Sequence, residues 1–222
     1  MSKRKTLARW PDGATRADVA RLPILAKPYT ICVQYFSPDM EKALMSTCDH
    51  IVRMAAYNEV MNEKLYSAAG QLSQEELFAD RKAFFGSLFG TMNHLVVADT
   101  IWLKRFCGHP ARQPALDAIR AAAAPAALNQ PQAEDLTGLL KLRHTLDQTI
   151  QRWAADLTPD DLEQPLGYAN MKGVVSRKRY SSLIMHFFNH QTHHRGQATT
   201  LLSQSSIDIG ATDLLMLIPN ED

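Results

Sequence analysis

The sequence has few cysteines, no long apolar run and almost no net charge, and each absence excludes a class of protein. Its three cysteines are far apart and include no CxxC pair, which indicates reduced thiols in a cytoplasmic protein rather than a disulfide framework. No stretch of about 18 uninterrupted apolar residues suggests a membrane span, and the basic start lacks the apolar segment of a secretory signal. A formal net charge of +1 gives no electrostatic reason to expect binding to nucleic acid or to a membrane.

The chain does have enough apolar residues to form one sizeable core. Its 222 residues are 45% hydrophobic and 21% charged, as in an ordinary globular protein. Residues 1–38 contain four prolines and no sustained period, so we expect an N-terminal extension there. We expect the folded domain at residues 39–206, and an apolar but irregular tail, residues 207–222, that packs on it.

Most of the expected domain repeats apolar residues at intervals of three and four, which is the spacing of one helix face. This pattern predicts four long helices, at residues 39–69, 83–106, 134–157 and 180–203. Ser73-Gln-Glu-Glu76 has the form of a capping box and predicts a short helix, and another is expected within 117–124. Two short extended runs around Lys172-Gly173 predict a small β-hairpin. The expected fold is therefore all-α, a four-helix bundle with long crossover connections and a small β-hairpin before the last helix.

The last expected helix is rich in histidine. Four of the eight histidines of the chain fall within nine residues, namely His186, His190, His193 and His194. Residues four apart lie one turn above each other, so two imidazoles at that spacing can bind one divalent metal ion. His186, His190 and His194 form one stripe, and His193 lies beside it. Histidines in such a cluster also form structural polar networks, which is the alternative reading.

A third metal ligand has to come from another helix, and the candidates are His50, His94, His109 and His144. His94 is the best placed, because it interrupts an apolar stripe where a buried imidazole is costly unless a metal satisfies it. His50 on the first helix is the nearest substitute. His109 lies in a Gly-His-Pro turn that is expected to be exposed, and His144 has a position on its helix that suits solvent equally well.

Several motifs around these histidines resemble a known family. The last helix contains Asn189-His190-Gln-Thr-His-His194-Arg195-Gly196-Gln197, and related stretches are Ala56-Tyr57-Asn58, Asp80-Arg-Lys-Ala-Phe-Phe85-Gly86-Ser87, Gly90-Thr-Met-Asn93-His94-Leu95 and Asp99-Thr-Ile-Trp102-Leu103. Together they resemble the motifs of the DinB-like (YfiT-like) four-helix metalloproteins over about residues 39–205. The resemblance implies that one divalent ion is held by His94 from the second helix and by His190 and His194 from the fourth. His186 and His193 then lie next to the ligands.

A site of three histidines leaves coordination positions open, which is typical of a reactive metal. Zinc suits such a site, and nickel is the other metal we expect, although imidazole ligands do not decide the identity. The resemblance further implies an enzyme that acts on a small molecule, either a thiol-dependent transferase or a hydrolase. The transferase would use a low-molecular-weight thiol as cosubstrate. It also implies a homodimer.

Other side chains of these motifs have secondary roles in this reading. Asn93, Asn189, Arg195 and Gln197 flank the ligands and are candidates to orient an imidazole, or else to bond between helices. Gly196 is expected to let two helices approach closely. The aromatic and methionine side chains nearby are expected in the core; they are Trp102, Phe106, Met185, Phe187 and Phe188.

Two rival interpretations of the whole chain stay open at this point. The first is a non-catalytic, stress-associated dimeric bundle that binds metal or another ligand without turnover. The second is a bundle that serves mainly to form dimers and whose histidines have no present role. Nothing in the sequence favours DNA polymerase or DNA-binding activity.

Overall fold

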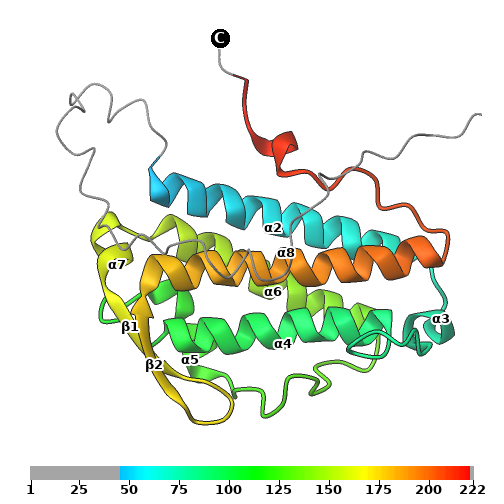
Figure 1. Cartoon of the computed structure of the whole chain (residues 1–222), viewed down its shortest axis with the longest axis horizontal. Helices are drawn as coiled ribbons and strands as arrows, with labels where there is room; N and C mark the ends of the chain where they lie inside the picture. The colour runs from blue at the N-terminus through cyan, green and yellow to red at the C-terminus, as the bar shows by residue number, and fades with distance from the viewer. Residues whose placement is uncertain (1–45, 221–222) are drawn as a thin grey trace, which may run out of the picture. The chain divides into compact units, whose positions relative to one another are not determined.

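Four long helices pack into a bundle in the computed structural model, which describes residues 46–220 (Figure 1). They are α2 (Thr47–Ala69), α4 (Leu88–Phe106), α6 (Leu136–Ala155) and α8 (Tyr180–Gln204). Both α2 and α4 pack against α6 and α8, so α2 lies diagonally opposite α4, and α6 lies diagonally opposite α8. This arrangement confirms the predicted all-α four-helix bundle.

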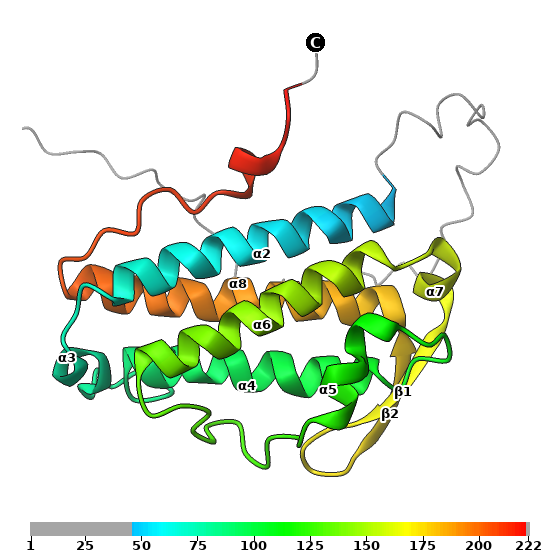
Figure 2. The same cartoon turned by 180° about the vertical axis from the view of Figure 1, so that it is seen from behind.

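Short elements fill the connections between these helices (Figure 2). They are α3 (Gln74–Phe78), η2 (Pro114–Leu116), α5 (Asp117–Ala121), α7 (Pro159–Glu163), β1 (Pro165–Ala169), β2 (Val175–Arg179) and η3 (Leu214–Leu217). The connections from α2 to α4 and from α6 to α8 lead to the diagonal helix, so these two are the crossovers. β1 and β2 form the expected antiparallel hairpin, with Pro165 opposite Arg179, and the hairpin leads directly into α8.

Helix α2 begins at Thr47 because Ser46 caps it. The Ser46 hydroxyl accepts a hydrogen bond from the backbone N–H of Asp49, and the Asp49 carboxylate accepts one from the backbone N–H of Ser46. The predicted start at residue 39 was therefore wrong for this helix, and Asp39 itself lies outside the described residues. So do residues 1–38, the expected extension.

Helix α4 begins at Leu88, five residues later than its apolar period predicts. Lys82 and Gly86 have positive φ values of 55° and 76°, and this left-handed backbone forms a tight turn that cannot continue a helix. Ser87 then caps α4 by accepting a hydrogen bond from the backbone N–H of Gly90. The turn places Phe85 beside α4 rather than within it.

A single hydrophobic core runs between the four helices. Trp153 on α6 stacks on Phe106 of α4 with ring centroids 5.2 Å apart, and Phe187 of α8 meets both rings. Trp102 and Phe188 are also buried, as expected. Met185 was expected in this core but is 71% exposed, because it lies on the outer face of α8.

A polar network crosses the core and joins all four helices. Arg143 on α6 donates to the carboxylates of Asp99 on α4 and of Asp147 one turn along α6, and all three side chains are buried. The side chain of Asn58 on α2 donates to Asp147, and its carbonyl oxygen accepts from Arg195 on α8. Since each member pairs with another, the network fixes the helices against one another.

The C-terminal segment passes along α2. The Tyr57 hydroxyl donates to the backbone oxygen of Thr212 at 2.6 Å, and the Lys64 ammonium donates to that of Ala211 at 2.7 Å. Farther on, Leu215 and Met216 are exposed. Among residues 46–220, no helix combines the length and the apolar character that a membrane crossing requires.

Candidate metal centre

Three histidines from two helices meet at one point inside the bundle. One ring nitrogen each of His94 on α4 and of His190 and His194 on α8 lie within 4.8 Å of one another. The ring centroids of His190 and His194 are 4.4 Å apart. The ring centroid of His94 lies 4.5 Å from that of His194 and 5.4 Å from that of His190. His94 and His194 are buried, and His190 is half-buried. The structure thus brings together the three histidines that the sequence analysis named.

Two of these imidazoles have their second nitrogen occupied by an acceptor. Nδ1 of His94 lies 2.9 Å from the backbone oxygen of Leu128, and Nδ1 of His194 lies 2.7 Å from Oε1 of Gln197. Because a carbonyl oxygen only accepts, Nδ1 carries the proton in both rings. Each ring therefore presents an unprotonated Nε2 to the common point.

The spacing of these nitrogens suits a divalent ion. Nε2 of His190 and Nε2 of His194 are 3.1 Å apart. Two imidazole nitrogens bound to one tetrahedral zinc ion stand roughly 3.3 Å apart, given bond lengths of about 2.0 Å. Two facing lone pairs repel unless a cation or a proton lies between them. The donor set and its orientation therefore fit a metal ion.

The three rings are neutral at neutral pH. Burial lowers the pKa of His94 to about 4, and burial together with the neighbouring histidines lowers the pKa of His190 to about 3. Burial also lowers the pKa of His194. Since a metal ion binds a neutral imidazole through its unprotonated nitrogen, these lowered pKa values favour metal binding near pH 7.

The histidines form one end of a pocket of about 390 Å³. Phe85 covers one side of it, with its ring stacked on that of His94 at a centroid distance of 3.9 Å. This contact depends on Gly90, because a side chain there would collide with the backbone oxygen of Phe85. The remaining side of the site opens into the pocket, so a bound ion would be accessible to a small molecule.

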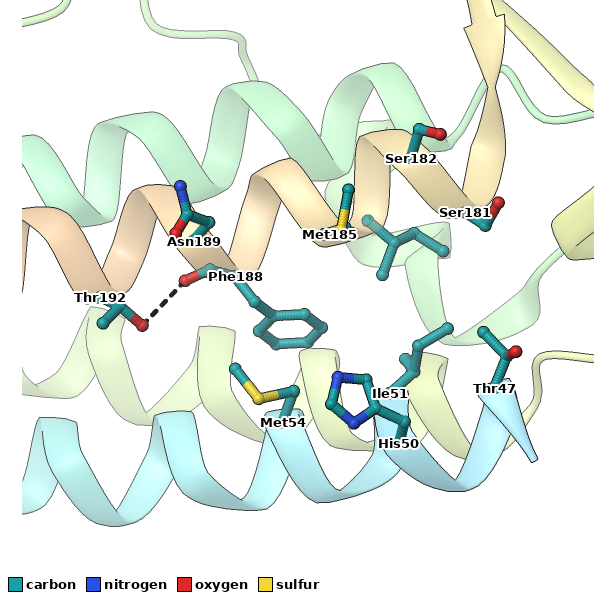
Figure 3. Close-up of a pocket in the computed structure, with 11 residues that line it drawn as sticks. Thr47, His50, Ile51, Met54, Ser181, Ser182, Met185, Phe188, Asn189 and Thr192 are labelled. Carbon is teal, nitrogen blue, oxygen red and sulfur yellow. Dashed lines mark hydrogen bonds between the residues drawn. The ribbon is translucent and has the colours of Figure 1, made fainter. Parts of the chain in front are cut away.

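The other candidate ligands lie elsewhere. His144 is exposed on α6. His50 lines a separate pocket of about 400 Å³ between α2 and α8, together with side chains such as Met54 and Phe188 (Figure 3). His109 was expected to be exposed, and this was wrong. It is buried, because its Nε2 donates to the backbone oxygen of Asp161 and its ring stacks on Tyr180.

The flanking polar residues have different roles. Gln197 contacts two histidines, since its Oε1 accepts from His194 and its Nε2 donates to Nε2 of His193 at 3.2 Å. Asn93 bonds instead to the backbone of Gln130 and Gln132 and so holds the loop that carries Leu128.

Two further flanking residues make no polar contact with the candidate ligands and belong to other features. Asn189 is exposed and lines the pocket of His50 (Figure 3). Arg195 belongs to the buried polar network. His186 and His193 are exposed beside the ligands, and the His186 ring packs on Trp102 at a centroid distance of 4.9 Å.

Sequence reasoning missed two contacts of this site. The backbone oxygen of Leu128 orients His94, and every residue has such an oxygen, so no residue type signals it. The Phe85 ring was missed because its apolar position matches the helical period of α4. The Phe85-Gly86 pair was the available signal, because glycine is common where the backbone turns left-handed.

Comparisons with known proteins bear on the same part of the chain. The model of the DinB family matches residues 43–219, a range that includes all three histidines. The chain is 24% identical over 165 residues to Protein DinB of Bacillus subtilis (strain 168). The aligned region covers 74% of this chain and 91% of that protein. No solved structure gave a significant match.

Proposed function

The chain belongs to the DinB family, and from this premise we propose that it is a metal-dependent enzyme whose His94, His190 and His194 hold one divalent ion. The observation that carries the proposal is the orientation of the three rings. Their nitrogens converge at one point, and two of them are fixed by hydrogen bonds on the opposite nitrogen. Zinc is the first candidate for the ion and nickel the second.

The proposed reaction is the transfer of a low-molecular-weight thiol to a small electrophilic molecule, with hydrolysis of a small molecule as the alternative. A divalent ion at this site supplies Lewis acidity, which lowers the pKa of a thiol or a water molecule bound to it. No residue that lines the pocket within 46–220 is acidic, so the pocket offers no carboxylate to act as general base for water. A thiol has a lower intrinsic pKa than water and depends less on such a base, which favours thiol transfer.

The chain's own residues position and shield the reacting groups. Leu128 and Gln197 orient two of the imidazoles, and the Phe85 ring keeps water from one side of His94. The open side admits the substrate. We further propose that the protein is a homodimer and that it acts in the cytoplasm, where low-molecular-weight thiols are abundant.

The proposal is tested by loading metal-free protein with zinc and following the reaction of monochlorobimane with cysteine, glutathione, mycothiol or bacillithiol. We expect acceleration with at least one thiol, its loss in His190→Ala and its retention in His144→Ala, which alters an exposed histidine outside the site. Hydrolysis of p-nitrophenyl acetate without thiol acceleration would select the hydrolase alternative. If the zinc-loaded protein shows neither activity, the non-catalytic metal-binding bundle is favoured instead.

A further inference from the structure

The pocket extends from the three histidines along one face of α4. Its lining residues on this helix recur at intervals of three and four, and they are His94, Ala98, Ile101, Trp102 and Arg105. His94 and Arg105 are eleven residues apart, which corresponds to about 16 Å along a helix axis. The pocket is therefore elongated, with the candidate metal site at one end and an arginine at the other.

The guanidinium group of Arg105 is held by two aromatic rings. Its Cζ lies 4.5 Å from the ring centroid of Trp102 and 5.2 Å from that of Tyr168. Stacking of this kind fixes the plane of the guanidinium and leaves the N–H groups on its edge free to donate. Trp102 precedes Arg105 by one turn, so the group points back toward the histidines.

No acidic partner balances this charge within the described part of the chain. The side chain of Arg105 makes no ion pair or hydrogen bond there, whereas Arg143 and Arg179 pair with carboxylates. The lining residues of the pocket include no acidic side chain. A half-buried cation in these surroundings lacks the counter-charge that would offset its desolvation.

We propose that Arg105 binds the carboxylate of an elongated small-molecule substrate whose reacting group lies at His94, His190 and His194. This inference rests on the proposed function and adds a substrate class to it. The substrate has an apolar middle that contacts Ala98 and Ile101. Its length is on the order of 10 Å, because the Arg105 side chain points back by about one turn and so shortens the distance of about 16 Å along the helix.

A carboxylate fits this position better than a phosphate group. One guanidinium fork pairs with two oxygens, which satisfies a carboxylate completely. The other polar side chains of the pocket, Gln197 and His193, belong to the histidine end and leave no donor for a third oxygen. The neighbouring pocket between α2 and α8 has no arginine or lysine among its lining residues, so it offers no comparable anchor (Figure 3).

The test compares two thiols of equal length, 6-mercaptohexanoate and 6-mercaptohexan-1-ol, by calorimetric titration of the zinc-loaded protein. We expect the carboxylate to bind at least about tenfold more tightly than the alcohol. That ratio falls to about one in Arg105→Gln and is partly kept in Arg105→Lys, which retains the charge without the fork. Arg112→Gln, at an exposed arginine that pairs with Asp117, leaves the ratio unchanged.

A second arm separates this inference from the proposed function. Hexanoate and hexan-1-ol are titrated into metal-free protein, and the indole N–H of Trp102 is followed by NMR. If the Trp102 resonance shifts with hexanoate but not with hexan-1-ol, and does not shift in Arg105→Gln, the anion site is supported even in a protein that takes up no zinc. Equal binding of acid and alcohol by the wild-type protein in both arms overturns it, whatever the metal content.

Discussion

At the scale of single residues, Gln197 decides how the last helix presents its histidines. Its carboxamide oxygen accepts from Nδ1 of His194, and its amino group donates to His193, so both ends of the amide are used. This bond keeps the proton of His194 on Nδ1 and the lone pair on Nε2, which faces His190 at 3.1 Å. Such partners of a metal-bound histidine also raise its basicity.

Substitution of Gln197 tests this role. Gln197→Leu is expected to lower zinc affinity by about 10–100-fold, because His194 loses the group that orients it. Gln197→Glu keeps an acceptor and should retain the affinity. Competition with a chromophoric chelator measures both, and circular dichroism checks that helix content is unchanged. Equal zinc affinity in Gln197→Leu and the wild-type protein would contradict the orienting role.

The residues that the sequence identified share one property, and those it missed share another. His94, His190 and His194 stand out by residue type and spacing, and the family resemblance selects the same three. Phe85 and Arg105 have ordinary residue types, and their positions matter only because a turn and a stack place them in the pocket. Leu128 contacts His94 through its backbone oxygen, which every residue has, so its residue type gives no signal.

At the scale of elements, the turn before α4 rests on that helix at Gly90. The ring of Phe85 reaches His94 because its backbone can lie directly over the glycine. Gly196 in α8 offers a comparison. It was expected to permit close helix packing, but a Cβ there would meet nothing within 4 Å, so that expectation was wrong.

Alanine at the two positions should therefore have opposite effects. Gly90→Ala is expected to lower the free energy of unfolding by about 1–3 kcal/mol, because the turn has to move away from α4. Gly196→Ala is expected to raise it by up to about 1 kcal/mol, the gain in helix propensity alone. Urea denaturation of the metal-free proteins measures both. A stabilised Gly90→Ala variant would show that the turn does not depend on this close contact.

Element types were more predictable from the sequence than element boundaries. The apolar period found all four long helices, and turn residues found the hairpin before α8. Boundaries depend on which polar side chain caps a helix, and both Asp39 and Ser46 suit the start of the first one. The start of α4 was misplaced because Phe84 continues the apolar period, although it is 84% exposed in the turn.

At the scale of the whole molecule, the buried network centred on Arg143 and Asp147 connects the bundle to the candidate metal site. Asp147 accepts from Arg143, Asn58 and Asn62, and Arg195 of the same network follows His194 in the chain. Its partners are up to 137 residues apart in sequence, so no local pattern predicts these pairings.

Loss of one charge from this network should be costly. Asp147→Ala is expected to destabilise the fold by about 3–5 kcal/mol, because Arg143 stays buried with one partner fewer. Glu163→Ala, which breaks an exposed pair with Arg179, should cost less than about 1 kcal/mol. Chemical denaturation compares the two variants. Similar small losses in both would mean that the buried network contributes little to stability.

The most direct test of the account is metal content, measured by elemental mass spectrometry on untagged protein. The variants are His94→Ala, His190→Ala and His194→Ala, with His144→Ala as the control. The account predicts about one divalent ion per chain in the wild-type protein and the control, and its loss in all three site variants. A wild-type protein that takes up neither zinc nor nickel, or a His190→Ala variant that keeps stoichiometric metal, would contradict it.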